Sequence, residues 1–177
     1  MLNIGDTAPD FNAKDALGNE VSLQELLKSG PVVMLFRRYV GCPICQQRFN
    51  DLGDDIEDFR KRDANVLAVV GGSVKKTKAW QEKRSSPLKF IPDVQRKLYD
   101  LFEVKPGGLR EFSSPGTVAA VIKAVVRGNM QGKPEGNPLQ LPADFVIGRD
   151  GIIKAAKYGK HYGDYLSNEE LLKILDR

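Results

Sequence analysis

The chain has 177 residues and a net charge of +4, and its 41% hydrophobic and 28% charged residues are the balance of an ordinary globular domain. Its only two cysteines lie three positions apart, which excludes the disulfide framework of a small secreted domain. No apolar run reaches the roughly 20 residues of a membrane span, so we expect no membrane association. The densest basic stretch, residues 75–84, has no nucleic-acid motif beside it, so we expect no nucleic-acid partner.

The length is that of one domain, so we expect residues 1–177 to fold as a single unit. No basic segment followed by an apolar core opens the chain, and no signal peptide is visible. The cysteine usage favours the reducing cytoplasm as the location.

The first half of the chain predicts a hairpin followed by a strand–helix–strand unit. The expected elements are a hairpin (10–14 and 20–23), a short helix (23–28), a strand (32–38), a helix (43–62) and a strand (66–70). Ser22 and Glu25 resemble a capping box for the short helix. The two apolar strands are expected to be parallel, joined by a right-handed crossover.

The second half predicts further helices and an antiparallel strand pair. The expected elements are a helix capped by Ser73, a strand (87–91), a helix (92–102), a glycine-rich loop (103–114), a helix that is capped by Ser114 and opens at Pro115, a loop (127–141), strands (142–148 and 152–158) and a last helix with a Ser167–Glu170 capping box. The Pro115 helix carries Val118, Val121, Ile122 and Val125 on one face. Met130, in the loop that follows, is expected to fill a gap in the core rather than to line a substrate pocket.

The two cysteines fall where the strand at 32–38 passes into the helix at 43–62. Cys42 is expected at the N-cap, and Pro43 at the first helical position, where a proline ring suits the turn. The unpaired N–H groups and the dipole of a helix N-terminus favour an anion. We therefore expect Cys42 to be an exposed thiolate with a lowered pKa, with Arg37 and Arg38 adding positive charge.

Cys45 lies one turn further on and continues an apolar stripe through Phe49, Leu52, Ile56 and Phe59, so we expect it to face the sheet. An attacking thiol with a shielded partner in reach forms a redox pair. The alternative is two buried cysteines that act only as small apolar residues. A Cys-x-x-Cys beside a strand–helix–strand pattern favours the redox interpretation.

The order of elements resembles the thioredoxin fold, and Gly5 to Phe11 (Gly-Asp-Thr-Ala-Pro-Asp-Phe) is similar to the start of the AhpC/TSA peroxiredoxins. Arg38 and the segment 128–132 look like the Cys-x-x-Cys branch that includes the prostamide/prostaglandin F synthases. The resemblance implies a three-layer α/β fold with a central mixed sheet flanked by helices. It also implies reduction of a peroxide or endoperoxide through Cys42, resolution by Cys45 as an intramolecular disulfide, and a thioredoxin-type or glutathione-type electron donor.

The chain departs from typical peroxiredoxins at three positions. Tyr39 and Leu35 stand where these proteins have a hydroxyl residue and a proline, and Pro142 stands where they have an arginine before a late strand. We therefore expect slow reduction of hydrogen peroxide. Pro142 instead resembles the cis-proline of thioredoxin-like reductases.

Three further interpretations stay open. The protein can be a thioredoxin-like disulfide reductase or electron carrier, or a redox-inactive interaction module, or a metal-binding module. Zinc prefers four ligands and the chain offers Cys42, Cys45 and His161, so we expect no metal and no other cofactor. His161 is expected to have no catalytic role. Asp144 and Asp150 are expected in turns or on the surface, with Asp144 as a candidate acceptor for the Cys45 proton. We expect a monomer or a homodimer.

Overall fold

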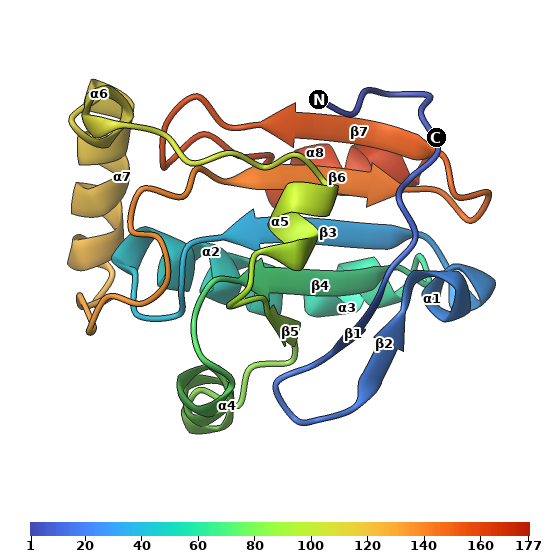
Figure 1. The fold of residues 1–177 in the computed structure, drawn as a ribbon, viewed down its shortest axis with the longest axis horizontal. Coiled ribbons are helices and arrows are strands. Elements are labelled where there is room, and N and C mark those ends of the chain that lie inside the picture. Colours follow the sequence, from blue (N-terminus) through green and yellow to red (C-terminus); the bar gives the residue numbers. More distant parts are fainter.

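A computed structural model describes residues 1–177, and its centre is a five-stranded sheet with the order β5-β4-β3-β6-β7 (Figure 1). Its strands are β3 (Val32–Arg37), β4 (Asn65–Val70), β5 (Lys89–Pro92), β6 (Ala143–Ile147) and β7 (Ile153–Tyr158). β3, β4 and β5 are parallel, whereas β6 pairs antiparallel with both β3 and β7. A short antiparallel hairpin, β1 (Asn12–Lys14) with β2 (Glu20–Ser22), precedes this sheet. The predicted mixed sheet and hairpin are confirmed.

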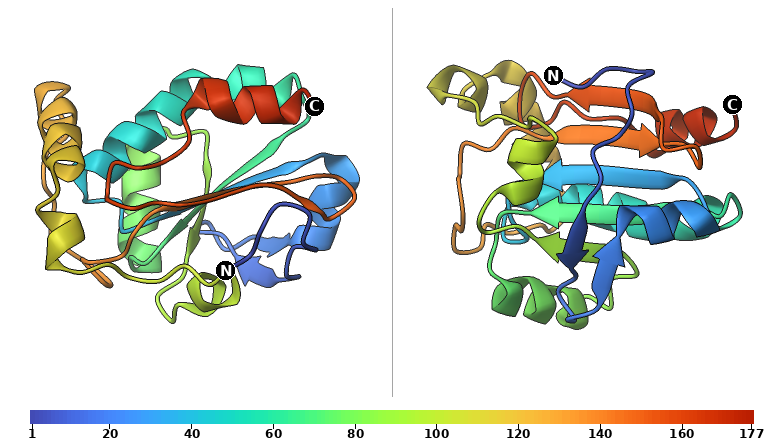
Figure 2. Two further views of the ribbon diagram at one scale, coloured as in Figure 1. Left: turned by 90° about the horizontal axis from the view of Figure 1, so that it is seen from above. Right: turned by 45° about the vertical axis from the view of Figure 1, so that its right-hand side comes forward.

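Helices cover both faces of the sheet and one end of it (Figures 1 and 2). They are α1 (Leu23–Ser29), α2 (Pro43–Asp54), α3 (Ile56–Arg60), α4 (Val74–Lys83), α5 (Lys97–Leu101), α6 (Leu109–Phe112), α7 (Pro115–Val126) and α8 (Asn168–Leu175). α2, α3 and α8 lie on one face, and α1, α5 and the β1–β2 hairpin lie on the other. α7 stands at the end of the sheet, against α2.

The central strands form because their side chains are apolar on both faces. All six side chains of β3 are buried, including the run Val32 to Phe36, as expected for a strand covered by helices on both sides. Even positions of β3 join the core under α1 and α5, and odd positions join the core under α2 and α8. In the second core, Trp80 of α4 packs edge-to-face on Phe49 and Phe90, with ring centroids 5.6 Å from each.

Several boundaries differ from the sequence prediction for identifiable reasons. The predicted helix 43–62 is two helices, because Asp55 has φ −99° and ψ 12° and interrupts the first one. The Ser22–Glu25 capping box is wrong: Ser22 makes no side-chain cap, and Glu25 pairs with Lys28 at 2.6 Å. The predicted loop 103–114 contains α6, whose Glu111 carboxylate accepts the Gly108 N–H at 2.7 Å.

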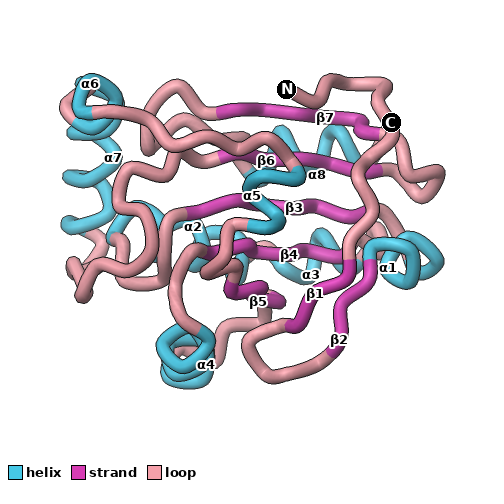
Figure 3. The backbone as a smooth tube through the Cα atoms, viewed as in Figure 1, coloured by secondary structure: helices cyan, strands magenta, loops and turns pink.

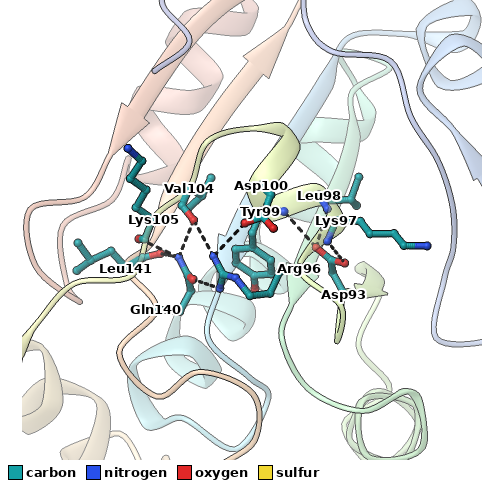
Figure 4. Close-up of polar contacts among 10 residues, drawn as sticks. All are labelled: Asp93, Arg96, Lys97, Leu98, Tyr99, Asp100, Val104, Lys105, Gln140 and Leu141. Carbon is teal, nitrogen blue, oxygen red and sulfur yellow. Dashed lines mark hydrogen bonds and ion pairs between the residues drawn. The ribbon is translucent and has the colours of Figure 1, made fainter.

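The predicted helix 92–102 shrinks to α5. Arg96 has φ +61°, a left-handed conformation that does not fit a right-handed α-helix, so no helix continues through this residue. The carboxylate of Asp93 instead accepts the N–H groups of Lys97, Leu98 and Tyr99, so it caps a helix that begins at residue 97 (Figure 4).

Other predicted caps are confirmed. Ser73 accepts the N–H of Lys76 at the start of α4, Ser114 accepts that of Thr117 at the start of α7, and Ser167 with Glu170 forms a capping box on α8. None of the helices has both the length and the apolar character that crossing a lipid bilayer requires.

Candidate active site

The cysteine pair lies at the N-terminus of α2, as the sequence predicts. Cys42 is the N-cap, its Sγ accepts the N–H of Cys45 at 3.4 Å, and Pro43 occupies the first helical position. Cys45 faces the sheet with Phe49, Leu52 and Phe59 in one core. Both cysteines are free thiols.

Cys42 is not exposed, and that prediction is wrong. Its exposed fraction is 0%, and that of Cys45 is 4%. The cover is the segment that links α7 to β6, which we call the strap (residues 128–140), visible as a long loop in Figure 3. The Gly132 N–H donates to the Gly41 carbonyl at 2.7 Å, directly beside Cys42. A Cβ atom on Gly41 would lie 3.3 Å from the Gly132 backbone, and one on Gly132 would lie 3.1 Å from the Gly41 backbone, so this close approach leaves little room for a side chain at either position.

Side chains that flank the cysteines in the sequence form hydrogen bonds with the strap. Gln46 donates to the Met130 carbonyl at 3.0 Å, and Arg38 donates to the Pro138 carbonyl at 3.1 Å. Gln131 of the strap donates to the Tyr39 hydroxyl at 3.0 Å. The strap therefore closes directly on the residues that flank the thiols.

Two anchors hold the strap further from the thiols. Near its middle, Glu135 accepts the Ser73 hydroxyl at 2.9 Å and pairs with Lys76 at 3.0 Å, at the N-terminus of α4. At its end, the amide of buried Gln140 donates to the carbonyls of Val104, Lys105 and Leu141, and its oxygen accepts from Arg96 (Figure 4). The strap is thus part of the folded structure rather than a free loop.

Arg38 is the charged partner of Cys42. Its Nη2 donates to the Cys42 Sγ at 2.9 Å, and its side chain is only 8% exposed. The guanidinium lies over the ring of Tyr162 at 4.5 Å and is 5.9 Å from the ring centroid of Tyr39. The structure therefore places the positive charge of Arg38 next to the Cys42 sulfur, as the sequence predicted.

The two thiols share one negative charge. Burial raises the pKa of Cys42 well above its usual value, and the hydrogen bond and charge of Cys45 add to this rise. Burial also acts against ionisation of Cys45, but the hydrogen bond from Cys42 and the charges of Arg38 and Arg37 outweigh it and lower its pKa to about 6. The prediction that Cys42 by itself has the lowered pKa is wrong, because the acidity belongs to the pair. Arg38 responds to this shared thiolate with a raised pKa: burial opposes the rise, and the charges of Cys45 and Cys42 outweigh burial.

Arg37 and Asp144 form a buried ion pair behind the site. Arg37 donates to Asp144 Oδ1 at 2.6 Å, and Asp144 Oδ2 accepts the Leu166 N–H at 2.7 Å. Asp144 is 0% exposed, so the expectation of a turn or surface position is wrong. Both its oxygens have partners, and the geometry gives no support to a role as acceptor of the Cys45 proton. Asp150 does lie in an exposed turn, paired with Lys154 at 2.7 Å.

Pro142 does not resemble the cis-proline of reductases in this structure. No peptide bond is cis. The Pro142 carbonyl accepts the Gly159 N–H at 2.9 Å, at the start of the β6–β7 pair.

Tyr162, whose ring covers Arg38, carried no signal in the sequence, whereas its neighbour His161 was a candidate because of its residue type. The Nδ1 of His161 accepts the Gly163 N–H at 3.2 Å, and its ring lies against Gly116 of α7. Tyr162 is 3% exposed and its hydroxyl has no partner. Tyr162 lies between His161 and Gly163 in a predicted loop, and nothing in its spacing indicated that it would contact a residue more than 100 positions earlier.

A groove of about 640 Å³ leads to Arg38 from the surface. Arg38, Tyr39 and Pro43 line one end of it, the apolar face of α7 forms a side, and the strap forms another side. Met130 lines this groove with an exposed fraction of 71%, so the prediction that it fills the core is wrong.

A mixed sheet with a Cys-x-x-Cys pair at the start of the helix after its first parallel strand defines a thioredoxin-like thiol protein. The model of the AhpC/TSA family matches residues 4–156, and the chain belongs to this family. It is similar to peroxiredoxin Q of Sedum lineare, with 33% identity over 110 residues, and to alkyl hydroperoxide reductase E of Mycobacterium tuberculosis, with 29% identity over 93 residues.

These alignments cover 58% and 52% of this chain. They cover 59% and 61% of those relatives, so the chain matches little more than half of their length. Among solved structures, peroxidoxin BcpB of Mycobacterium tuberculosis superposes with a TM-score of 0.75 at 23% identity, covering 99% of this chain and 97% of that one. Peroxiredoxin 6 of Arenicola marina gives the same TM-score at 18% identity, with 99% and 73% covered. The thioredoxin-like fold expected from the sequence is confirmed.

Proposed function

We propose that this protein is a peroxiredoxin-like thiol oxidoreductase that reduces a hydroperoxide through Cys42 and Cys45. The observation that carries the proposal is the 2.9 Å contact between the Arg38 guanidinium and the Cys42 Sγ, beside a second thiol on the same helix turn. A fixed positive charge stabilises a thiolate, and it stabilises the negative charge that develops on a peroxide oxygen during attack. Membership of the AhpC/TSA family supports the same reaction class.

The reaction balances with these two residues. The pair holds one proton and one negative charge; with the proton on Cys45, the Cys42 thiolate attacks one peroxide oxygen, the O–O bond breaks, and the alkoxide leaves and takes up the Cys45 proton to become an alcohol. The sulfur is oxidised by two electrons to a sulfenic acid. The Cys45 thiolate then attacks the Cys42 sulfur, an S–S bond forms, and the hydroxyl leaves as water after protonation. Cys45 is suited to this step because its pKa is lowered to about 6.

Return to the dithiol needs two electrons from outside the chain. We propose a thioredoxin-type or glutathione-type thiol donor, whose attack on Cys42 would release Cys45 as a thiolate of low pKa. The cytoplasm is the proposed location, since the reduced pair needs a reducing compartment. The peroxiredoxin Q relatives carry the word chloroplastic in their names. We propose no metal, no prosthetic group, and a monomer or homodimer.

A second candidate is a protein disulfide reductase. The Cys-x-x-Cys at a helix N-terminus favours it, because this arrangement also suits exchange with a substrate disulfide.

Stopped-flow oxidation of the reduced protein separates the two candidates. We expect hydroperoxides to oxidise Cys42 and Cys45 to a disulfide. This reaction should be faster than the reaction with a mixed-disulfide substrate at the same concentration. Cys42→Ser should abolish both reactions. A faster reaction with the disulfide would replace the first candidate by the second, and loss of no thiol with either oxidant would overturn both.

A further inference from the structure

A second cavity, separate from the groove, lies where α2, α7 and the start of α8 meet. Its volume is about 400 Å³, and none of the residues that line the groove lines it. α2 contributes Arg48 and Asp54 to its wall, and α7 contributes Lys123. Tyr165, in the turn before α8, is the one hydrophobic residue in the lining. The wall therefore suits a charged or strongly polar occupant rather than an apolar one.

Arg48 is a buried cation without a carboxylate partner. It is 1% exposed, its Nη1 donates to the side chain of Asn168, and its Nε and Nη2 have no acceptor within the chain. Its guanidinium lies 5.3 Å from the ring centroid of Tyr165, so two other lining residues flank it. The neighbouring buried arginine, Arg37, differs because it has the carboxylate of Asp144. A buried charge without a counter-ion is costly, and a carboxylate from outside the chain would compensate it.

Two further charges of the lining have no ion-pair partner. These are Lys123 and Asp54, both exposed at the rim. The remaining carboxylates of the lining are occupied within the chain, since Asp51 pairs with Arg127 at 3.2 Å and Asp55 accepts a side-chain amide at 2.6 Å. With the buried guanidinium, the unpaired charges of the cavity are two positive and one negative.

We propose that this cavity binds an acidic α-amino acid, which carries two carboxylates and one ammonium group. One carboxylate accepts from the guanidinium of Arg48, the other pairs with Lys123, and the ammonium group pairs with Asp54. A volume of about 400 Å³ is in the range of small-molecule sites. The site contains neither cysteine, so the proposal does not depend on the thiol chemistry.

Titration calorimetry of the full-length reduced protein with L-glutamate tests the proposal. Arg48→Gln should weaken binding about tenfold or more, which corresponds to about 1.4 kcal/mol. Lys123→Ser and Asp54→Asn should each weaken it several-fold, and both positions are on the surface, so these two variants do not depend on the packing of the core. The matched controls are Lys173→Ser and Glu57→Gln, which change exposed charges outside the lining and should keep the wild-type affinity.

Glutarate separates recognition of an amino acid from attraction of any anion. It has both carboxylates of glutamate but no ammonium group, so Asp54 would face a like charge in its complex. The wild-type protein should therefore bind glutarate about tenfold more weakly than glutamate. Asp54→Asn should strengthen glutarate binding while it weakens glutamate binding, a reversal that a loss of folding would not produce.

Two results would overturn the inference. If L-glutamate gives no heat of binding with the wild-type protein, the unpaired donors of Arg48 are satisfied by water alone. If glutarate or inorganic phosphate binds as tightly as glutamate, the cavity is a general anion site and the role assigned to Asp54 is wrong.

Discussion

The guanidinium of Arg38 compensates a charge that would otherwise be buried without a partner. The reduced cysteine pair carries one negative charge in a place that solvent does not reach, with exposed fractions of 0% and 4% for the two residues. An unpaired ion in such surroundings costs several kcal/mol. Arg38 meets that cost with a direct hydrogen bond to Cys42, and the ring of Tyr162 covers its other side.

The lowered pKa of Cys45 offers a direct test of this arrangement. Because the pKa of Cys45 is lowered to about 6, the thiolate should be present above that pH and disappear below it. The rate of iodoacetamide alkylation should therefore rise with pH around a midpoint near 6. Arg38→Met should move the midpoint up towards the ordinary thiol value of about 8.5. Arg127→Met removes a surface arginine as control, and an equal midpoint in the Arg38 variant would contradict the role of the guanidinium.

The two cysteines should give different products after one equivalent of hydroperoxide. Wild-type protein should lose about two hydrogens in mass, because the sulfenate of Cys42 condenses with the nearby Cys45 thiol. Cys45→Ser should instead gain one oxygen and stop there, and Cys42→Ser should remain unchanged. Intact-mass spectrometry reads all three. A disulfide-linked dimer from the wild type would show that resolution is intermolecular.

Among the elements, the strap explains why the cysteines could be located from the sequence but their burial could not. The position of Cys42 at a helix N-terminus is a local property, set by the apolar strand before it and by Pro43 after it. Its cover depends on contacts between segments about 90 residues apart, such as Gly41 with Gly132 and Tyr39 with Gln131. Glycines in a loop predict a turn or a close approach of two backbones, but their spacing in the sequence does not indicate which distant residue they contact.

The same distinction, between what local sequence determines and what the surrounding structure determines, applies to α5 and α7. The start of α5 depends on the left-handed conformation of Arg96, which residue-type preferences argue against. The apolar face of α7 was visible in the sequence, and its exposure was not, because the helix stands at the end of the sheet instead of on a face of it.

Opening of the strap should set how fast reagents reach the thiols. Glu135 holds the strap on Ser73 and Lys76 without touching either cysteine. Glu135→Ala should therefore raise the alkylation rate of the pair several-fold while leaving the pH midpoint near 6, since Arg38 is unchanged. Glu103→Ala, which removes an acidic side chain that pairs with the chain's N-terminus, is the control. An unchanged rate would mean that another segment limits access.

On the scale of the whole molecule, the Arg37–Asp144 pair joins the two halves of the sheet. Arg37 ends β3, Asp144 lies in β6, and the same carboxylate binds the backbone of Leu166 before α8. The pair therefore fixes the antiparallel half of the sheet and the last helix against the strand that leads to the cysteines. The sequence predicted both strands, but not that their polar residues would pair in the core, because register between distant strands is not encoded in spacing.

Breaking this pair should destabilise the fold. Asp144→Asn leaves the buried Arg37 charge without a counter-ion, and we expect a loss of about 3–5 kcal/mol in the free energy of unfolding. Glu169→Gln, which removes one partner of an exposed pair with Lys173, should cost less than about 1 kcal/mol. Urea denaturation of both variants measures the difference. Equal midpoints would show that the buried pair contributes little to stability.

The aromatic packing of Trp80 gives the protein an optical signal of its own. Trp80 is the one tryptophan in the chain, and its indole rests on Phe49, one helical turn after Cys45. If α2 repacks when the cysteines are oxidised or reduced, the surroundings of that indole change. The intrinsic fluorescence can therefore follow each step of the thiol chemistry in unlabelled protein, from a position outside the groove and the strap.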